Sequence, residues 1–180
     1  MDIINLFEKD VTINAVLYII EKIGGKVDMH KIFKILYFAD QEHLSKYGRT
    51  ITRDVYIAMN YGPVPSKTDD IFKAVRGDSY FPAGDLGKYF HFINKMMVVN
   101  DEKPNLDYLS ESDIMCLDHA ISKCKDLNFS ELTEMSHDYA WKSTAQNRRM
   151  SFSDILTEVG DTDEYARYVE NGLMLESSYR

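Results

Sequence analysis

The sequence predicts a single compact domain of the α+β class, mainly helical, with about seven helices and a small antiparallel β-sheet or hairpin. Three observations lead to this prediction. The chain has 180 residues, which is the length of one domain. Hydrophobic residues make up 44% of it, enough to fill a core without disulfides or a metal. Apolar residues recur at helical spacing over most of the chain, and alternating patterns are confined to short stretches. We therefore treat residues 1–180 as one domain.

The first two helices are marked by apolar periodicity and by glycines that follow it. A helix is expected over residues 11–23, because two glycines come directly after its last apolar residue. A second helix is expected over residues 28–47, with Asp28 as its N-cap and Gly48 as its stop. Two polar side chains interrupt the apolar face of this second helix.

The strands are predicted in the middle of the chain. Residues 52–60 alternate between two faces, as a strand does. Residues 61–65 follow with two prolines and a glycine, so we expect a rigid corner there that continues neither helix nor strand. Residues 88–93 and 95–100 are two short β-like runs around Asn94, consistent with a hairpin.

The remaining helices are predicted from capping residues that precede apolar stripes. They cover residues 66–75, 110–124, 130–141, 154–159 and 163–175. The expected N-caps are Ser66, Ser110, Ser130 and Ser153. A glycine-rich loop over residues 77–87 precedes the hairpin.

The charge is negative and unevenly distributed. The chain has 21 basic and 29 acidic residues, a net charge of −8, which argues against nucleic acid as a partner. Residues 151–180 alone hold seven acids and two bases, a net charge of −5. This acidic stretch is either a tail that meets a basic partner or the solvated face of a helix.

The two cysteines and the N-terminus indicate the compartment. Cys116 and Cys124 are eight residues apart in one expected helix, about 12 Å along its axis, which is too far for a disulfide. Free thiols fit the reducing cytoplasm, and the cysteines form no zinc-ligand pattern. Residues 1–10 do not resemble a signal peptide, and no apolar window approaches the roughly 18 residues of a membrane span. We expect a cytoplasmic protein with neither a cofactor nor a membrane partner.

The polar side chains on the second helix allow two interpretations. Asp40 and His43 are three residues apart on one face, and His30 lies earlier on the same helix. These three residues would be the ligands or acid–base groups of a metal-dependent enzyme, although the sequence offers no second spaced ligand pair. The structural interpretation is favoured: Asp40 is a buried carboxylate held by backbone donors or by Arg49 or Arg53, and His43 forms hydrogen bonds beside it.

The rest of the sequence contains no recognisable catalytic motif. Ser136, His137 and Asp138 are neighbours on an expected helix, so their side chains point in different directions and cannot form a triad. The sequence has no nucleophile elbow, P-loop or dinucleotide fingerprint. We therefore expect no catalytic residue and no enzymatic activity.

DNA binding is the alternative function, because two helices followed by strands is the order of a winged-helix transcription regulator. The second helix has as many acidic residues as lysines, whereas a recognition helix is usually basic. Lys142, Arg148 and Arg149 form the one modest basic cluster, and three cations more often mark an ordinary surface than a phosphate track.

Three segments in a fixed order carry a resemblance to a known protein family. They are Lys-Ile-Leu-Tyr-Phe-Ala-Asp-Gln-Glu-His-Leu at 34–44, Tyr-Gly-Arg-Thr-Ile-Thr at 47–52, and Ile-Ala-Met-Asn-Tyr-Gly-Pro-Val-Pro-Ser at 57–66. Leu-Ser-Glu at 109–111, the segment 129–137 and Trp141-Lys142 follow. Together they resemble the Panacea (SocA-like) antitoxin domain family, formerly grouped with uncharacterised phage-associated proteins. The resemblance covers about residues 11–160 and leaves 161–180 as an acidic extension.

The resemblance implies a mainly helical α+β domain that neutralises a protein toxin encoded by an adjacent gene. Neutralisation in this family is by direct contact and, in some members, as an adaptor that delivers the toxin to a protease. No catalytic residue comes with the resemblance. The signature positions, which we interpret as structural, are Tyr37, Asp40, His43, Tyr47, Gly48, Tyr61, Gly62, Pro63, His137 and Trp141.

The surface that contacts the toxin is expected where sequences of the family can vary. Tyr80 and Phe81 place two large rings in the glycine-rich loop, which needs either an intramolecular dock or a partner. Asp163 and Glu164 lie in the acidic extension. We predict that these four residues contact the toxin.

Overall fold

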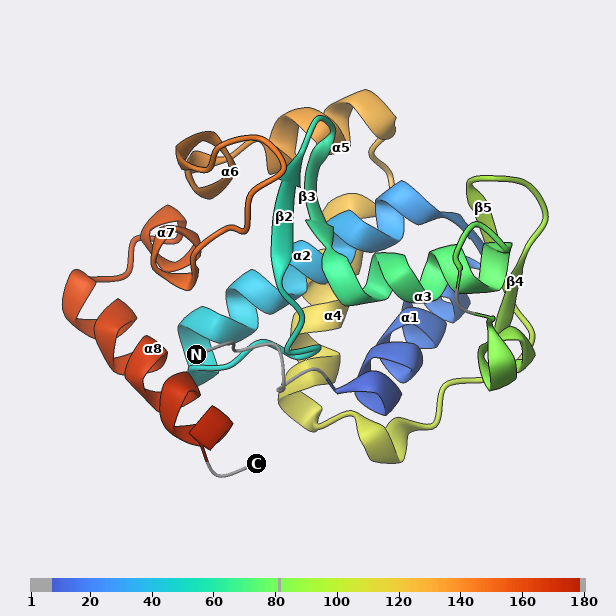
Figure 1. Cartoon of the computed structure of the whole chain (residues 1–180), viewed down its shortest axis with the longest axis horizontal. Coiled ribbons are helices and arrows are strands. Elements are labelled where there is room, and N and C mark those ends of the chain that lie inside the picture. Colours follow the sequence, from blue (N-terminus) through green and yellow to red (C-terminus); the bar gives the residue numbers. More distant parts are fainter. Residues whose placement is uncertain (1–7, 81, 179–180) are drawn as a thin grey trace.

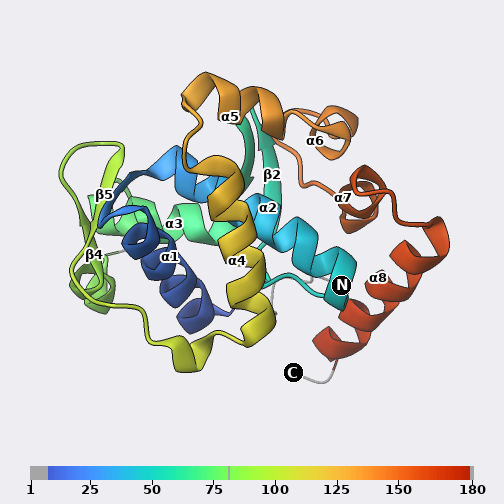
Figure 2. The same cartoon turned by 180° about the vertical axis from the view of Figure 1, so that it is seen from behind.

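Helix α2 (Met29–Tyr47) is the centre of the structure, a computed structural model that describes residues 8–80 and 82–178. In Figure 1, the hairpin of β2 (Tyr56–Met59) and β3 (Gly62–Pro65) and helix α3 (Ser66–Arg76) lie in front of α2. Figure 2 shows the opposite side, where α4 (Glu111–Cys124) crosses α2 and α1 (Lys9–Ile23) lies beside α4. Because it is covered from both sides, α2 is buried along almost its whole length.

The first two helices follow the sequence prediction closely. Helix α1 ends at Gly24, which has a φ of 114°, a conformation that glycine adopts without steric cost. The side chain of Asp28 accepts a hydrogen bond from the backbone N–H of His30 and so caps α2. Gly48 ends α2 in the left-handed conformation. The expected caps and stops are confirmed.

A three-stranded antiparallel sheet lies at one end of the helices. Its order is β1 (Lys26–Asp28), β5 (Met97–Asn100) and β4 (Phe90–Phe92). The hairpin predicted around Asn94 is confirmed, and the Asn94 side chain accepts two backbone N–H groups of the turn. Strand β1 is too short for a recognisable sequence pattern and was not predicted.

The second sheet corrects the expectation of a rigid corner at 61–65. Strand β3 (Gly62–Pro65) pairs with β2 (Tyr56–Met59), so this segment is a strand despite its prolines. Ala58 on β2 forms its backbone hydrogen bonds with the segment 147–150 on the other side, so alternate residues of β2 pair with β3. In that register the nitrogens of both prolines of β3 lie on the side away from β2. No described strand pairs with β3 on that side, so no N–H donor is required there.

Helix α3 is capped differently from the prediction. The expected capping box of Ser66 is absent, and no side chain from the residue before the helix supplies a cap. Instead the Asp54 carboxylate accepts the backbone N–H groups of Lys67 and Thr68 and the hydroxyl of Thr68. A capping group thirteen residues before Lys67 leaves no local signature in the sequence. The loop that follows contains a short 3-10 helix (Gly84–Lys88).

The single helix predicted over residues 130–141 is divided into two helices in the structure. Residues 130–141 contain the end of α5 (Phe129–Ser136) and the start of α6 (Tyr139–Ser143), because the backbone leaves the helical conformation at His137. Asp138 then caps α6 by accepting the N–H of Trp141. The cap of α5 is Asn128, not Ser130.

The C-terminal helices stand at one side of the molecule in Figure 1. They are α7 (Phe152–Glu158), capped by Ser151 and not by Ser153, and α8 (Asp163–Ser178). A second 3-10 helix (Leu106–Tyr108) precedes α4, whose predicted capping box is confirmed. The mainly helical α+β class is therefore confirmed, with eight α-helices in the described residues.

Two other expectations concern single features. Cys116 and Cys124 are free and buried, as predicted from their separation. None of the helices within residues 8–80 and 82–178 combines the length and the apolar character that a membrane span requires.

Candidate functional site

The inner side of the β2–β3 hairpin is fixed to α2 by a buried lysine. The Lys34 side chain is completely buried, and its Nζ donates a hydrogen bond of 2.9 Å to the carbonyl oxygen of Pro63. Burial lowers the pKa of Lys34 to about 7. Gly62 has a φ of 97°, and a Cβ there would collide with the Ser136 hydroxyl and lie 2.8 Å from Lys34 Nζ. The hairpin turn therefore packs against α2 and α5 at a distance that only glycine allows.

The segment between α5 and α6 holds the same hairpin from another direction. Trp141 Nε1 donates to the carbonyl oxygen of Met59 at 2.9 Å, and the indole stacks on His137 with ring centroids 3.6 Å apart. The Tyr37 hydroxyl on α2 donates to the carboxylate of Asp138 at 2.7 Å. Burial lowers the pKa of His137, so its ring favours the neutral form. Signature positions far apart in the sequence thus meet at the hairpin.

The buried carboxylate of Asp40 forms a second set of contacts between α2 and a segment distant from it in the sequence. Its carboxylate accepts hydrogen bonds from the N–H of Ile51, from the N–H and hydroxyl of Thr52, and from the hydroxyl of Tyr56. The backbone donors expected for a buried Asp40 are therefore present. Burial raises the pKa of Asp40 to about 6, although these donors oppose the rise. Asp40 connects α2 to the chain that leads into β2.

His43 forms hydrogen bonds, as predicted, and none of them involves Asp40. Its Nδ1 lies 2.8 Å from the carbonyl oxygen of Arg49, and its Nε2 lies 3.0 Å from the Asp113 carboxylate at the start of α4. Arg49 donates to the same carboxylate at 2.9 Å and not to Asp40. Burial opposes the shift, but hydrogen bonds from His43 and Ser110 and the charge of Arg49 lower the pKa of Asp113 to about 2. This cluster joins the end of α2 to α4.

The structure does not bring the three candidate metal ligands together. His30 Nε2 lies 3.2 Å from the carbonyl oxygen of Tyr61, and the His30 ring stacks on Phe129. Asp40 and His43 have the separate partners described above. Within the described part of the chain, no group of three or more His, Cys, Asp or Glu side chains is arranged to hold a metal ion.

Helix α2 also lacks the exposed basic face of a DNA-recognition helix. Lys34 is buried, Lys31 donates to the carbonyl oxygen of Lys125, and Lys46 pairs with Glu42. These contacts add to the neutral charge balance of the helix. Both observations weigh against the winged-helix alternative.

The other signature positions lie at the end of α2 and in the turn of the hairpin. Tyr47 is half exposed and packs on the His43 ring, with centroids 4.6 Å apart. Gly48 faces α8, where the side chains of Tyr165 and Val169 lie 3.9 Å from the position of a Cβ. Tyr61 is 61% exposed and points away from the core.

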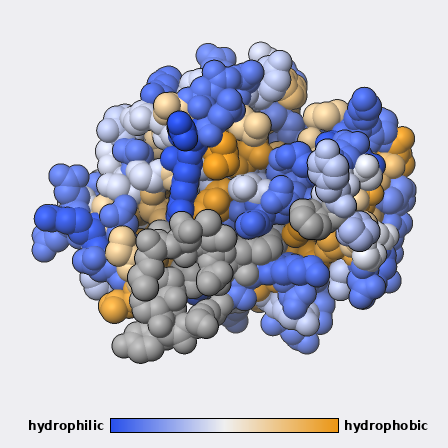
Figure 3. Space-filling model, in the orientation of Figure 1, coloured by the Kyte–Doolittle hydropathy of each residue, from blue (hydrophilic) through white to orange (hydrophobic). Residues whose placement is uncertain are grey.

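The outer side of the hairpin borders an apolar groove of about 480 Å³. Its apolar walls come from α2, the hairpin, the turn before β5 and the start of α5, and they include Met29, Phe33, Met59, Tyr61, Met96 and Phe129. Asp69 and Lys73 of α3 border it and form an ion pair. Figure 3 shows hydrophobic surface over the hairpin, surrounded by hydrophilic residues.

The predicted toxin contacts that the structure describes, Tyr80, Asp163 and Glu164, lie on either side of this groove. Tyr80 is fully exposed beyond the end of α3, and Phe81 lies outside the described residues. Asp163 and Glu164 are exposed in the first turn of α8. In Figure 1, α8 and the end of α3 lie at opposite sides with the hairpin between them. The structure thus does not bring Tyr80 together with the two acids, and a partner that touched both ends would cross the hairpin.

Residues 32–142 match the family model described as antitoxin SocA-like, Panacea domain. This match covers more than half of the chain. The chain belongs to the SocA-like antitoxin family. The matched part of this Panacea domain runs from α2 to α6 and contains the hairpin with its buried anchors, whereas α1, α7 and α8 lie outside it. No curated protein and no solved structure gives a significant match.

The structural roles of several important residues of this Panacea domain were not predicted from the sequence. Lys34 lies within an apolar stretch of α2, and its burial follows from the distant hairpin. Asp54 accepts hydrogen bonds from the start of α3, and Asp113 forms an ion pair with a residue that follows α2, so neither partner is a close neighbour in the sequence. Asp138 has a local signal as an N-cap three residues before Trp141. The groove residues are spread over five elements, so no sequence window contains them.

Proposed function

We propose that this SocA-like protein is an antitoxin that neutralises a cognate protein toxin, encoded by an adjacent gene, by binding it directly in the cytoplasm. The observation that carries the proposal is the family match over residues 32–142. This match includes the hairpin and every anchor that fixes its inner side.

The geometry supports binding as the mode of action. The buried polar side chains of Tyr37, Asp40 and His43, three of the signature positions, are occupied by internal contacts. Groups held in this way stabilise a fold and are not presented to a substrate. The accessible features are an apolar groove and exposed rings, which are features of protein-binding surfaces.

The proposed contact includes Tyr80 at one side of the hairpin, with Phe81 as the next residue in the sequence, and Asp163 and Glu164 at the other side. Tyr80 is fully exposed, so a partner would bury most of its ring. The two acids lie at the start of a helix that carries further acidic residues, and they suit a basic patch of the toxin.

Co-expression with the adjacent gene tests the proposal. The toxin alone should stop growth, and the antitoxin should restore it and co-purify with the toxin in a complex. A toxic neighbour that is neither rescued nor bound contradicts the proposal. The level of toxin in rescued cells separates two mechanisms: occlusion leaves it unchanged, and delivery to a protease lowers it.

Charge reversal and ring removal test the proposed contact. The pairs Tyr80→Ala with Phe81→Ala and Asp163→Lys with Glu164→Lys should each weaken toxin binding. The matched controls are Tyr108→Ala for the ring and Asp126→Lys with Glu102→Lys for the acids, all exposed residues that do not line the groove. Unchanged binding of both contact variants would move the contact elsewhere.

A further inference from the structure

Three exposed cations lie beside the hairpin without an ion-pair partner. They are Lys142, Arg148 and Arg149, in α6 and in the segment that follows it. No hydrogen bond or ion pair to a described residue involves the charged group of any of them. In a chain with a net charge of −8, three unpaired cations in one place form an unusual positive patch.

The backbone that carries the arginines is held rigidly against β2. The N–H of Asn147 donates to the carbonyl oxygen of Ala58 at 2.7 Å, and the N–H of Ala58 donates to the carbonyl oxygen of Arg148 at 3.0 Å. The N–H of Met150 donates to the carbonyl oxygen of Tyr56 at 2.9 Å. The segment therefore runs beside the hairpin with a bridge between Ile57 and Arg149, and the backbone that carries the two arginines keeps a fixed position relative to β2.

The positive patch lies beside the apolar groove. Asn147 lines the groove next to Tyr61, and Asn60 lines both the groove and a neighbouring hollow that also contains Lys142. The partly exposed Ile57 and Val64 lie opposite each other on the hairpin. Figure 3 shows strongly hydrophilic residues projecting directly beside the hydrophobic surface of the hairpin.

We infer that the groove and the positive patch form one docking surface for a segment of the toxin that carries apolar side chains next to carboxylates. The apolar side chains enter the groove against Tyr61 and Phe129, and the carboxylates pair with Lys142, Arg148 and Arg149. This inference rests on the proposed antitoxin function and adds the chemistry of the partner.

Charge complementarity selects this partner. The patch is positive although the protein is acidic, so an acidic segment is attracted to this face and repelled by the acidic surface of α8. The adjacent groove offers methionine and aromatic side chains, which bind apolar anchors of a protein. Nucleic acid would use the cations but would leave the apolar groove without a role, and three cations are few for a phosphate track.

Two variants of the full-length protein test the surface separately. The charge variant is Lys142→Glu with Arg148→Glu and Arg149→Glu, and its control is Lys26→Glu with Lys103→Glu and Lys125→Glu, which are exposed lysines on other elements. The groove variant is Tyr61→Ala, and its control is Tyr108→Ala. Thermal melts confirm that each variant is folded.

Binding is measured by calorimetry with the purified product of the adjacent gene. We expect the charge variant to raise Kd by about tenfold or more and to reduce the dependence of Kd on salt. We expect Tyr61→Ala to raise Kd by about tenfold or more, and the controls to change Kd less than about threefold.

The outcomes distinguish the inference from the proposed function. If the wild type binds and both variants bind equally well, the docking surface is wrong and the antitoxin function stands. If the wild type does not bind a confirmed toxic neighbour, both fail. A duplex from upstream of the reading frame that is bound by the wild type and lost by the charge variant, with toxin binding unchanged, would assign the cations to nucleic acid and overturn the inference.

Discussion

The hairpin region and helix α8 use their acidic residues in opposite ways. Around the hairpin, Asp40 and Asp54 are buried and accept several hydrogen bonds each, so they join segments that are distant in the sequence. On α8, Asp163 and Glu164 are exposed at the start of the helix. The two regions also differ in their relation to the family, because the match at 32–142 contains the first and not the second.

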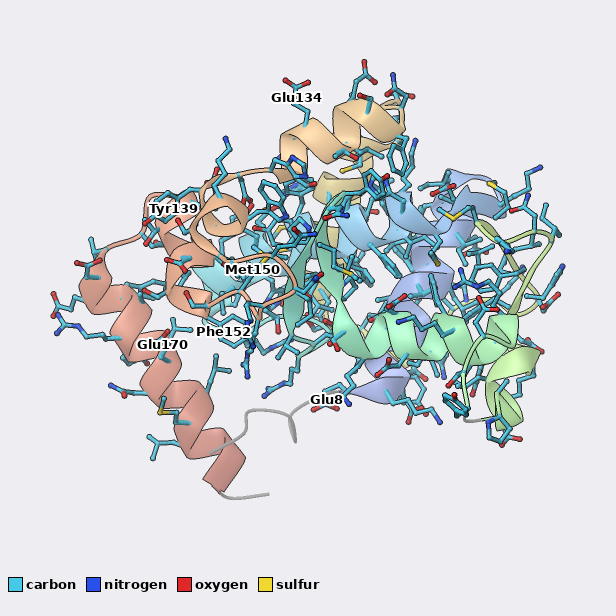
Figure 4. The ribbon with its side chains drawn as sticks, turned by 45° about the horizontal axis from the view of Figure 1, so that its top comes forward. Glu8, Glu134, Tyr139, Met150, Phe152 and Glu170 are labelled. Carbon is cyan, nitrogen blue, oxygen red and sulfur yellow. The ribbon has the colours of Figure 1, made fainter. Side chains whose placement is uncertain are left out.

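This difference separates residues that hold the fold from residues that are free to contact a partner. Helix α8 packs against the core through Ala166, Val169 and Leu173, and the Tyr165 hydroxyl donates to the carbonyl oxygen of Ser45 at 2.8 Å. The outward-pointing Glu134 on α5 shows that exposed acids also occur within the matched region (Figure 4). The contrast is therefore between inner and outer surfaces as well as between two parts of the chain.

The largest expected effect is that of removing a buried carboxylate. Asp40→Ala leaves the donors of Ile51, Thr52 and Tyr56 without an acceptor, so we expect a loss of about 4 kcal/mol in the free energy of unfolding. Asp163→Ala should cost less than about 1 kcal/mol, because it removes an exposed charge at a helix start. Urea denaturation of both variants measures the difference, and equal losses would remove the distinction between the two regions.

The next largest loss of stability is expected from substitution of a glycine with positive φ, and a second such glycine serves as its control. Gly62→Ala should cost about 3 kcal/mol, because the new methyl collides with Ser136 and approaches Lys34 in addition to the strained φ. Gly160→Ala, between α7 and α8, has a similar φ of 84° but no atom within 4 Å of the new Cβ. It should cost about 1 kcal/mol, from backbone strain alone. Denaturation midpoints of the pair therefore isolate the close packing of the hairpin turn.

These two comparisons also show what the sequence could predict. Local signals predicted α1, α2, the β4–β5 hairpin and the capping box of α4, because their caps and stops are adjacent to the elements. The strand β3 could not be predicted, since its prolines are tolerated only because that edge is free.

The candidate site was partly predictable. The motif positions identified the inner side of the hairpin, and burial of Asp40 by backbone donors was expected. The actual partner of His43 and the groove depend on tertiary contacts between elements far apart in the chain. The four predicted toxin contacts stay predictions.

A pH dependence of about 2 kcal/mol is expected from Lys34. Its pKa is about 7 in the folded protein and 10.5 as its ordinary value, so between these values the unfolded chain binds the proton more readily. Stability from this group therefore rises as the pH rises from 7 to 9. Lys34→Met removes the titration, and the difference in unfolding free energy between wild type and variant should change by this amount over that range. A constant difference would contradict the burial of an ionisable Lys34.

The smallest effect on stability is expected on α8. Asp163→Lys with Glu164→Lys should lower the free energy of unfolding by about 1 kcal/mol, through the helix dipole. The same variant should weaken toxin binding, whereas Asp126→Lys should change neither property appreciably. A loss of stability comparable to that of Asp40→Ala would show that α8 holds the fold as the hairpin anchors do.

Hydrogen exchange of the free protein and of its complex with the adjacent gene product tests the central claim most directly. The claim is that the outer surface of the hairpin binds the toxin while the inner network holds the fold. We predict that complex formation slows exchange in the turn at 60–61, at the start of α5 and in the segment 144–149. The amides of α2 should already be slow in the free protein. Slowing confined to elements that do not border the groove or the positive patch would contradict the claim.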